Sequence, residues 1–267
     1  NMIDLALDNG INYFDTADLY DKGGNEEMLG KAFKGRRDKV IIGSKAGNQW
    51  RADGSKWDWN PRKEYILKCA EASLKRLDTD YLDLFMLHGG TIQDDIMESI
   101  EAFEILLKQG KIRYYGLSSI RPNVIRVHVN YGKLISVMTQ YSLLDRRPEE
   151  TTLDLLHKNN IGVLVRGSVG TGLLIDKPAK PYLDHTETSV ANAAEAVHHI
   201  SDGKRSPAQT AIQYVLHHSA VTTVVVGMHT KKQLEEAVGA LQQNPLTEDE
   251  IEYLRNRIPA LKYTQHR

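Results

Sequence analysis

Short apolar runs alternate with amphipathic stretches along the whole chain. The runs are rich in β-branched and aromatic residues and end at turn residues, which is typical of strands buried on both faces. The stretches between them repeat apolar residues at helical spacing. The predicted strands are Ile11–Phe14, Val40–Ser44, Leu82–Leu87, Ile112–Leu117, Ser136–Gln140, Gly162–Val165 and Thr223–Val226. The predicted helices are Glu26–Phe33, Lys63–Arg76, Asp95–Gln109, Asn123–Val129, Pro148–Lys158, Pro207–His217 and Lys232–Leu241.

Local signals place several helix ends. Met2–Gly10 is typical of the last turns of an amphipathic helix closed by a glycine. Asn25 and Asn60 are predicted N-caps, the second followed by Pro61 at the first helical position. Thr247 begins a capping box, which predicts a final helix.

Strand–helix alternation predicts a parallel sheet with right-handed crossovers, and therefore an α/β fold. We expect a (β/α)8 TIM barrel made by a single domain over residues 1–267. Such a barrel has eight strands, whereas seven are predicted and the chain opens inside a helix. We therefore expect the first strand to lie outside this sequence, so that the domain is incomplete at its N-terminus. An open doubly wound sheet is the alternative, although its G-x-G-x-x-G fingerprint is absent.

Composition and charge limit the classes of partner that we expect for this chain. With 41% hydrophobic residues and a formal net charge of −1, the chain gives no electrostatic reason to expect nucleic acid or an anionic membrane surface as a partner. No apolar run approaches the ~20 residues of a membrane-spanning helix. The lone cysteine, Cys69, excludes an internal disulfide and favours a reducing, cytoplasmic location. The oligomeric state stays open.

Polar residues stand at or just beyond the carboxyl ends of the first three predicted strands. Asp15, Lys45 and His88 close these strands, and Tyr20 lies on the loop after Asp15. The carboxyl ends of barrel strands are the usual catalytic positions, so we expect the four residues to face one pocket. Each alone has an ordinary explanation as a cap, a loop anchor or a core residue. A lysine at the end of a buried strand is the hardest to explain in that way, because lysine is rarely buried without a partner.

These four residue types suggest one reaction. A tyrosine phenol titrates near ~10 and is a poor proton donor until an adjacent ammonium favours its phenolate. Asp15 would hold Lys45 in place, and His88 would orient a substrate oxygen. Together they predict polarisation of a carbonyl and delivery of a proton to the developing alkoxide. Side chains supply no hydride, so a nicotinamide cofactor is implied.

Several motifs resemble one family. They are Asp15-Thr-Ala-Asp-Leu-Tyr20, Gly24-Asn-Glu-Glu-Met-Leu-Gly30, Ser44-Lys45-Ala-Gly47, Leu87-His88, Gly110–Ser119, Gln140–Leu144, Gly172–Leu174 and Val226-Gly227. In order and over almost the whole chain they resemble the aldo-keto reductases, most of all the bacterial branch of general reductases. The resemblance implies a (β/α)8 barrel that binds NADPH and reduces small-molecule aldehydes or ketones, with Tyr20 as the acid.

The resemblance also implies a set of cofactor-binding residues. Ser118, Ser119 and Gln140 match positions that hold the nicotinamide amide, and Arg166 stands where many relatives place an aromatic ring. The further matching positions are Gly167, Ser168, Gly172 and Leu173 toward the pyrophosphate, and Gly227, His229, Lys231, Gln233 and Glu236 toward the adenine end. His229 and Thr230 depart from the cations that relatives carry for the 2′-phosphate. NADPH is nevertheless favoured, with NADH as the alternative.

Trp50, Trp57 and Trp59 crowd the loop after Lys45 and predict an apolar wall for substrate, with packing of the loop on itself as the alternative. Residues 176–186 form a loop shorter than that of relatives.

Two other functions compete with reduction. Some relatives bind nucleotide as sensors or accessory subunits with little turnover. A metal-dependent hydrolase would use Asp15 and His88 as ligands, but further ligands at strand ends are missing. The histidine pairs 198–199 and 217–218 also lack metal-ligand spacing, so no metal is expected.

Overall fold

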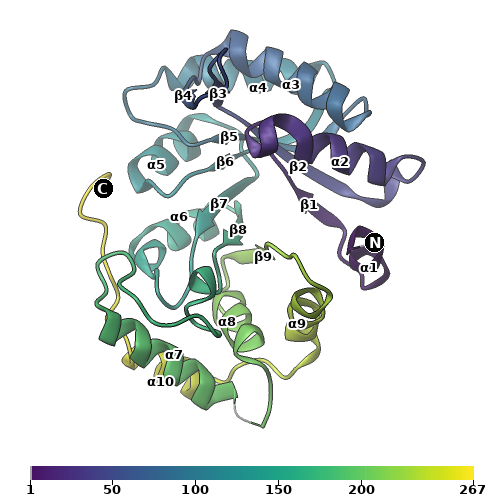
Figure 1. Cartoon of the computed structure of the whole chain (residues 1–267). Helices are drawn as coiled ribbons and strands as arrows, with labels where there is room; N and C mark the ends of the chain where they lie inside the picture. Colours follow the sequence, from purple (N-terminus) through teal and green to yellow (C-terminus); the bar gives the residue numbers. More distant parts are fainter. Residues whose placement is uncertain (1, 202) are drawn as a thin grey trace. The chain divides into compact units, whose positions relative to one another are not determined.

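The computed structural model describes residues 2–201 and 203–267, in which the chain forms two compact units (Figure 1). The first unit covers residues 3–137 and the second covers residues 138–267. In both, parallel strands alternate with helices, as the sequence pattern predicts. No helix in the described part of the chain is long and apolar enough to cross a membrane.

The first unit contains four parallel strands. In spatial order they are β1 (Tyr13–Asp15), β2 (Ile41–Ala46), β5 (Leu82–His88) and β6 (Ile112–Ser118). Its helices are α1 (Met2–Asp8), α2 (Gly24–Phe33), α3 (Lys63–Leu77), α4 (Ile96–Lys108) and α5 (Pro122–Tyr131). β5 is buried along its length except at His88. Its Phe85 packs edge-on against Phe103 of α4, so helix and sheet share one apolar layer.

The second unit continues the alternation. Its strands are β7 (Ser136–Gln140), which begins at the junction, β8 (Gly162–Arg166) and β9 (Val221–Val225). Its helices are α6 (Thr152–Lys158), α7 (Glu187–Ser201), α8 (Pro207–Leu216), α9 (Lys231–Gln242) and α10 (Glu248–Asn256). The rings of Tyr141 and Tyr214 lie 6.2 Å apart in its core, and both phenols donate to Glu149.

Short helical turns and one hairpin complete the fold. The 3-10 turns are η1 (Tyr20–Gly23), η2 (Arg37–Lys39), η3 (Arg147–Glu150) and η4 (Gly170–Gly172). The loop that carries the three tryptophans is an antiparallel hairpin of β3 (Asn48–Trp50) and β4 (Trp57–Trp59), which the sequence pattern did not predict. Helix α7 was also missed, because its alanine-rich sequence lacks a strong apolar stripe.

All seven predicted parallel strands are present, with ends that shift by up to two residues. The predicted helix Pro148–Lys158 is wrong in its first turn: η3 ends at Glu150, and Thr151, with φ −155°, breaks the chain before α6. The helix end at Gly10 is confirmed, because Gly10 follows α1 with φ +82°. The capping box at Thr247 is also confirmed.

Both predicted asparagine caps are wrong. The Asn25 side chain accepts a hydrogen bond from Thr16 Oγ1, and Gly23, with φ +93°, precedes α2 instead. Asn60 accepts from the backbone N–H of Arg62 in a two-residue turn, and α3 begins only at Lys63. In each case the asparagine side-chain oxygen accepts a different hydrogen bond from the one that an N-cap would accept from the first turn of the helix.

A charged cluster fastens the amino-terminal ends of β2, β5 and β6. The buried Asp83 carboxylate accepts from Arg37 Nη2 at 2.7 Å, Arg113 Nη1 at 3.0 Å and the Ile42 N–H at 2.9 Å. The two guanidinium groups lie 4.1 and 4.0 Å from the centre of the Tyr81 ring. One carboxylate therefore ties a neighbouring strand and two cations to β5.

We expect Asp83→Asn to lower the free energy of unfolding by about 2–3 kcal/mol, because charged hydrogen bonds to a buried carboxylate are lost. Urea unfolding measures the change. Asp58→Asn is the control: Asp58 pairs with Arg51 in an exposed ion pair, so its loss should change stability far less than the loss of Asp83. Equal losses in both variants would contradict this account of the cluster.

Candidate active site

Asp15, Lys45 and His88 lie at the carboxyl ends of three adjacent strands. Asp15 is the last residue of β1, Lys45 is the second-last of β2, and His88 is the last of β5. These strands are parallel neighbours, and His88 pairs in register with Ser118 at the end of β6. The first unit therefore brings the predicted catalytic residues to one edge of its sheet.

The Lys45 ammonium is at the centre of this edge. Its side chain is 0% exposed, and Nζ donates to Asp15 Oδ2 at 2.5 Å and to the Thr16 carbonyl at 2.8 Å. The third donation is to the Tyr20 hydroxyl at 3.5 Å. A buried ammonium is stable only when its N–H groups are satisfied and its charge is balanced, and here both conditions are met.

Asp15 has a second partner that the sequence analysis missed. The Tyr13 hydroxyl donates to Asp15 Oδ1 at 3.2 Å, so each carboxylate oxygen has its own donor. Burial raises the pKa of the Asp15 carboxyl above its ordinary value, while Lys45 and Tyr13 oppose that rise. Strand alternation was the available signal, because residues two apart on a strand share a face.

Tyr20 and His88 face each other beside the ammonium. Their rings are 6.0 Å apart and nearly perpendicular, and Lys45 Nζ lies 4.9 Å from the Tyr20 ring centre. Tyr20 is 39% exposed, so the phenol connects the buried charge to solvent. The four residues can therefore pass a proton from the phenol to an oxygen held beside His88, with Lys45 stabilising the phenolate that remains.

The β3–β4 hairpin packs beside this edge. Trp50 Nε1 donates to the carbonyl of Leu19, next to Tyr20, and the Trp50 ring contacts Trp57 edge-on at 5.3 Å. Trp57 is 48% exposed. Trp50 thus fastens the hairpin to the loop that carries the phenol, whereas contact of these rings with a substrate stays a prediction.

Trp59 lies across the ends of β2 and β5. Its Nε1 donates to Asp94 Oδ1 at 3.0 Å, and its ring covers Gly47 and Gly89. A Cβ atom on Gly47 would come within 2.5 Å of the ring, and Gly47 has φ +133°. The ring is accommodated because the strand ends carry glycines beside Lys45 and His88.

Ser118 and Ser119 are predicted to hold the nicotinamide amide. Ser118 ends β6, Ser119 follows it, and both are buried. Ser119 Oγ accepts from the backbone N–H of Arg121 at 3.2 Å. The hydroxyls therefore lie at the same strand edge as the predicted catalytic residues of the first unit.

In the second unit, Gln140 and Arg166 end β7 and β8 and contact each other. Arg166 Nη1 donates to Gln140 Oε1 at 3.0 Å. Gly167 follows with φ +76°, and a Cβ atom placed on it would lie 3.4 Å from Cγ of Gln140. Gln140 Nε2 donates to Asp145 and Tyr182. Amide, guanidinium and glycine backbone are groups that suit a polar aromatic cofactor.

The remaining predicted cofactor residues lie in the second unit. Ser168 and Leu173 are buried around η4, and Gly172 has φ +91°. Gln233 completes the capping box of α9, because its Oε1 accepts from the backbone N–H groups of His229 and Thr230. Lys231 is exposed and pairs with Glu235. Gly227 is exposed and Glu236 is half-buried. Their contact with a cofactor stays a prediction.

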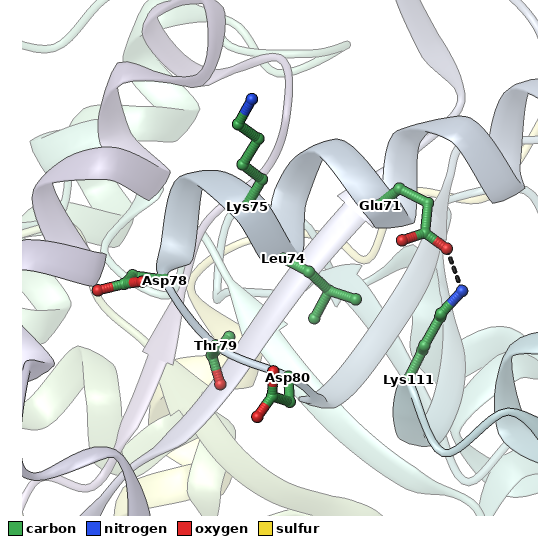
Figure 2. Close-up of a pocket in the computed structure, with 7 residues that line it drawn as sticks. All are labelled: Glu71, Leu74, Lys75, Asp78, Thr79, Asp80 and Lys111. Atoms are coloured by element: carbon green, nitrogen blue, oxygen red, sulfur yellow. Dashed lines mark hydrogen bonds and ion pairs between the residues drawn. The ribbon is translucent and has the colours of Figure 1, made fainter.

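One hollow of the first unit lies elsewhere (Figure 2). It is lined by the end of α3, the Asp78–Asp80 turn and Lys111, which pairs with Glu71. Asp80 and Lys111 precede β5 and β6, so this hollow opens at the amino-terminal edge of the sheet. It contains no residue of the catalytic edge and has no part in that site.

The chain matches a known family over most of its length. The model of the aldo/keto reductase family matches residues 1–258. An uncharacterised oxidoreductase, YqkF of Bacillus subtilis, is 44% identical over 100% of this chain and 90% of its own. The holo form of the aldo-keto reductase AKR11C1 from Bacillus halodurans has 43% identity and a TM-score of 0.93, covering 99% of this chain and 88% of that one. The NADH-specific methylglyoxal reductase of Escherichia coli is 28% identical over 95% of this chain and 85% of its own.

These similarities confirm the predicted fold class, the α/β barrel type of this family. Members of the family are NAD(P)H-dependent oxidoreductases that use NADPH or NADH.

Gly47→Ala tests how closely Trp59 covers the strand ends. We expect it to lower the free energy of unfolding by roughly 2–4 kcal/mol and to shift the tryptophan emission, because the new methyl group displaces the ring and the backbone is strained. Urea unfolding and fluorescence spectra measure both effects. Gly35→Ala is the matched control: φ is +76° there but nothing lies within 4 Å of the added atom. An unchanged emission spectrum in Gly47→Ala would rule out the displacement.

Proposed function

Because this chain belongs to the aldo/keto reductase family, we propose that it reduces aldehydes or ketones to alcohols at the edge formed by β1, β2 and β5. The observation that carries the proposal is the fully buried Lys45 ammonium, which joins the Asp15 carboxylate to the Tyr20 phenol. Apolar residues of similar size often serve stability as well as a buried ion pair or better, so stability alone gives little reason for such a group.

Each residue of the group has a separate task. Tyr20 donates its proton to the oxygen of the substrate carbonyl, and Lys45 stabilises the phenolate left behind. Asp15 balances the charge of Lys45 and fixes its position, with Tyr13 steadying the other carboxylate oxygen. His88 orients the substrate oxygen toward Tyr20.

A nicotinamide cofactor, when bound, supplies the hydride for this reduction. In the first unit, Ser118 and Ser119 offer hydroxyls suited to its carboxamide. In the second unit, Gln140 offers an amide for the same kind of group, and Arg166 offers a planar guanidinium that stacks on aromatic faces. Gly167, Ser168, Gly172 and Leu173 would approach the pyrophosphate through their backbone groups.

We favour NADPH over NADH as the cofactor. Lys231 and Lys232 occupy the first turn of α9, where cations oppose the helix dipole, so an anionic group nearby would stabilise them. His229 and Gln233 would border the same end of the cofactor, with Glu236 toward the adenine. The substrate would be a small carbonyl compound, with Trp50, Trp57 and Trp59 as an apolar wall.

The first test measures NADPH and NADH consumption with aromatic aldehydes and α-dicarbonyls, using wild type and Tyr20→Phe. We expect Tyr20→Phe to lower kcat by roughly 10²–10⁴-fold, because the proton donor is lost, and to change the cofactor dissociation constant by no more than about twofold. Equal loss of turnover and cofactor binding would make Tyr20 structural. Tight cofactor binding by the wild type without turnover of any carbonyl would favour a nucleotide-binding sensor instead.

A second test uses the pH dependence of kcat/KM in Tyr13→Phe. The Tyr13 hydrogen bond lowers the pKa of Asp15, so its loss raises that pKa further and protonates Asp15 at a higher pH. We expect the fall in activity on acidification to begin at a higher pH than in wild type. Tyr65→Phe is the control, because Tyr65 donates to Asp18 and not to Asp15. An unmoved acidic limb in Tyr13→Phe would exclude Asp15 as the group that titrates there.

A further inference from the structure

The amide of Gln140 is held in one orientation by groups behind it. Its Nε2 donates to Asp145 Oδ2 at 2.9 Å and to the Tyr182 hydroxyl at 3.0 Å. An amide nitrogen has two hydrogens, so both are engaged. Gln140 Oε1 is left on the other side, where Arg166 Nη1 donates to it at 3.0 Å.

Asp145 is what makes this orientation obligatory. The residue is 0% exposed and its two oxygens accept from Arg147 Nε and Nη2 at 2.7 and 2.8 Å. A carboxylate in a bidentate pair with a guanidinium is ionised and can only accept hydrogen bonds. The opposite amide orientation would set Gln140 Oε1 against Asp145 with no hydrogen between them, which buried polar groups do not tolerate.

Arg147 and the C-terminal segment hold Asp145 in turn. The Arg147 guanidinium lies 4.9 Å from the centre of the buried Tyr263 ring, and the backbone N–H of Tyr263 donates to Glu150. Tyr182 is steadied separately, because it pairs with His185, and the buried His185 ring contacts the Leu144 carbonyl at 3.1 Å. Tyr182 thus helps to hold the position of the amide, whereas Asp145 alone decides its orientation, because a hydroxyl can donate as well as accept.

We propose that Asp145 is a positioning residue that makes Gln140 present only an acceptor, so that the subsite selects a pyridine ring bearing an N–H donor at its carboxamide. This inference rests on the proposed function, which places a nicotinamide beside Gln140. A carboxamide NH2 satisfies Oε1. An acetyl group or a carboxylate at the same ring position offers only acceptors and faces Oε1 unfavourably.

The test compares the affinities of NADP⁺ and its 3-acetylpyridine analogue by isothermal titration calorimetry. Wild type should bind NADP⁺ more tightly by roughly 3–15-fold, the effect of one hydrogen bond. Asp145→Asn should reduce this ratio to within about twofold of unity, because an asparagine can donate to Oε1 and so lets the Gln140 amide reverse. A purely structural role for Asp145 would weaken both ligands equally and leave the ratio unchanged, which would overturn the proposal.

Two further variants keep the outcome decisive. Tyr182→Phe removes the other partner of the same Nε2 atom and should leave the ratio as in wild type, because Asp145 still fixes the amide. If Asp145→Asn fails to fold, Asp145→Asn combined with Arg147→Gln replaces the charged pair by two amides and should show the same loss of ratio. Wild type binding neither dinucleotide would overturn the proposed function together with this inference, whereas a wild-type ratio kept in the Asp145 variants would overturn the inference alone.

Discussion

The geometry of the site depends on the buried ammonium of Lys45. Such a charge is strongly destabilising unless an opposite charge lies beside it, and the Asp15 carboxylate supplies that charge. With no exposed surface, Nζ must donate all of its hydrogens to acceptors within the protein. Asp15, the Thr16 carbonyl and the Tyr20 hydroxyl meet this need from β1 and the loop that follows it. The desolvation that makes the pair costly is also what makes its field strong at the phenol.

Because the strands are parallel, residues that stabilise the sheet lie at one edge and the residues proposed to act on a substrate lie at the opposite edge. At the amino-terminal ends, Asp83 binds Arg37 and Arg113 around Tyr81 and fastens three strands together. At the carboxyl ends, the neighbouring strands β2 and β5 carry Lys45 and His88, for which we propose a catalytic role. We therefore expect substitutions at the amino-terminal ends to affect folding and substitutions at the carboxyl ends to affect turnover.

The sequence predicted the parallel strands and the four central residues, because apolar runs and strand-end polar residues are local patterns. It could not predict the partners that reach a residue through the fold. Asp145 lies five residues from Gln140, but nothing in the spacing shows that the turn between them brings the side chains together. Asn25 and Asn60 were misassigned as caps because Thr16 Oγ1 and the Arg62 N–H compete for their oxygens. The β3–β4 hairpin was missed because its three-residue strands are too short to show alternation.

The closed hydrogen-bond shell of Lys45 also has a consequence for the proposed reduction of reactive carbonyl compounds. Amines condense with aldehydes to form Schiff bases, and that step needs a nitrogen lone pair that the aldehyde carbon can approach. Lys45 Nζ donates to three oxygens and has no surface open to solvent, so the aldehyde carbon cannot reach it. The central cation can therefore lie beside electrophiles without being consumed by them, while the Tyr20 phenol that it contacts is open to solvent.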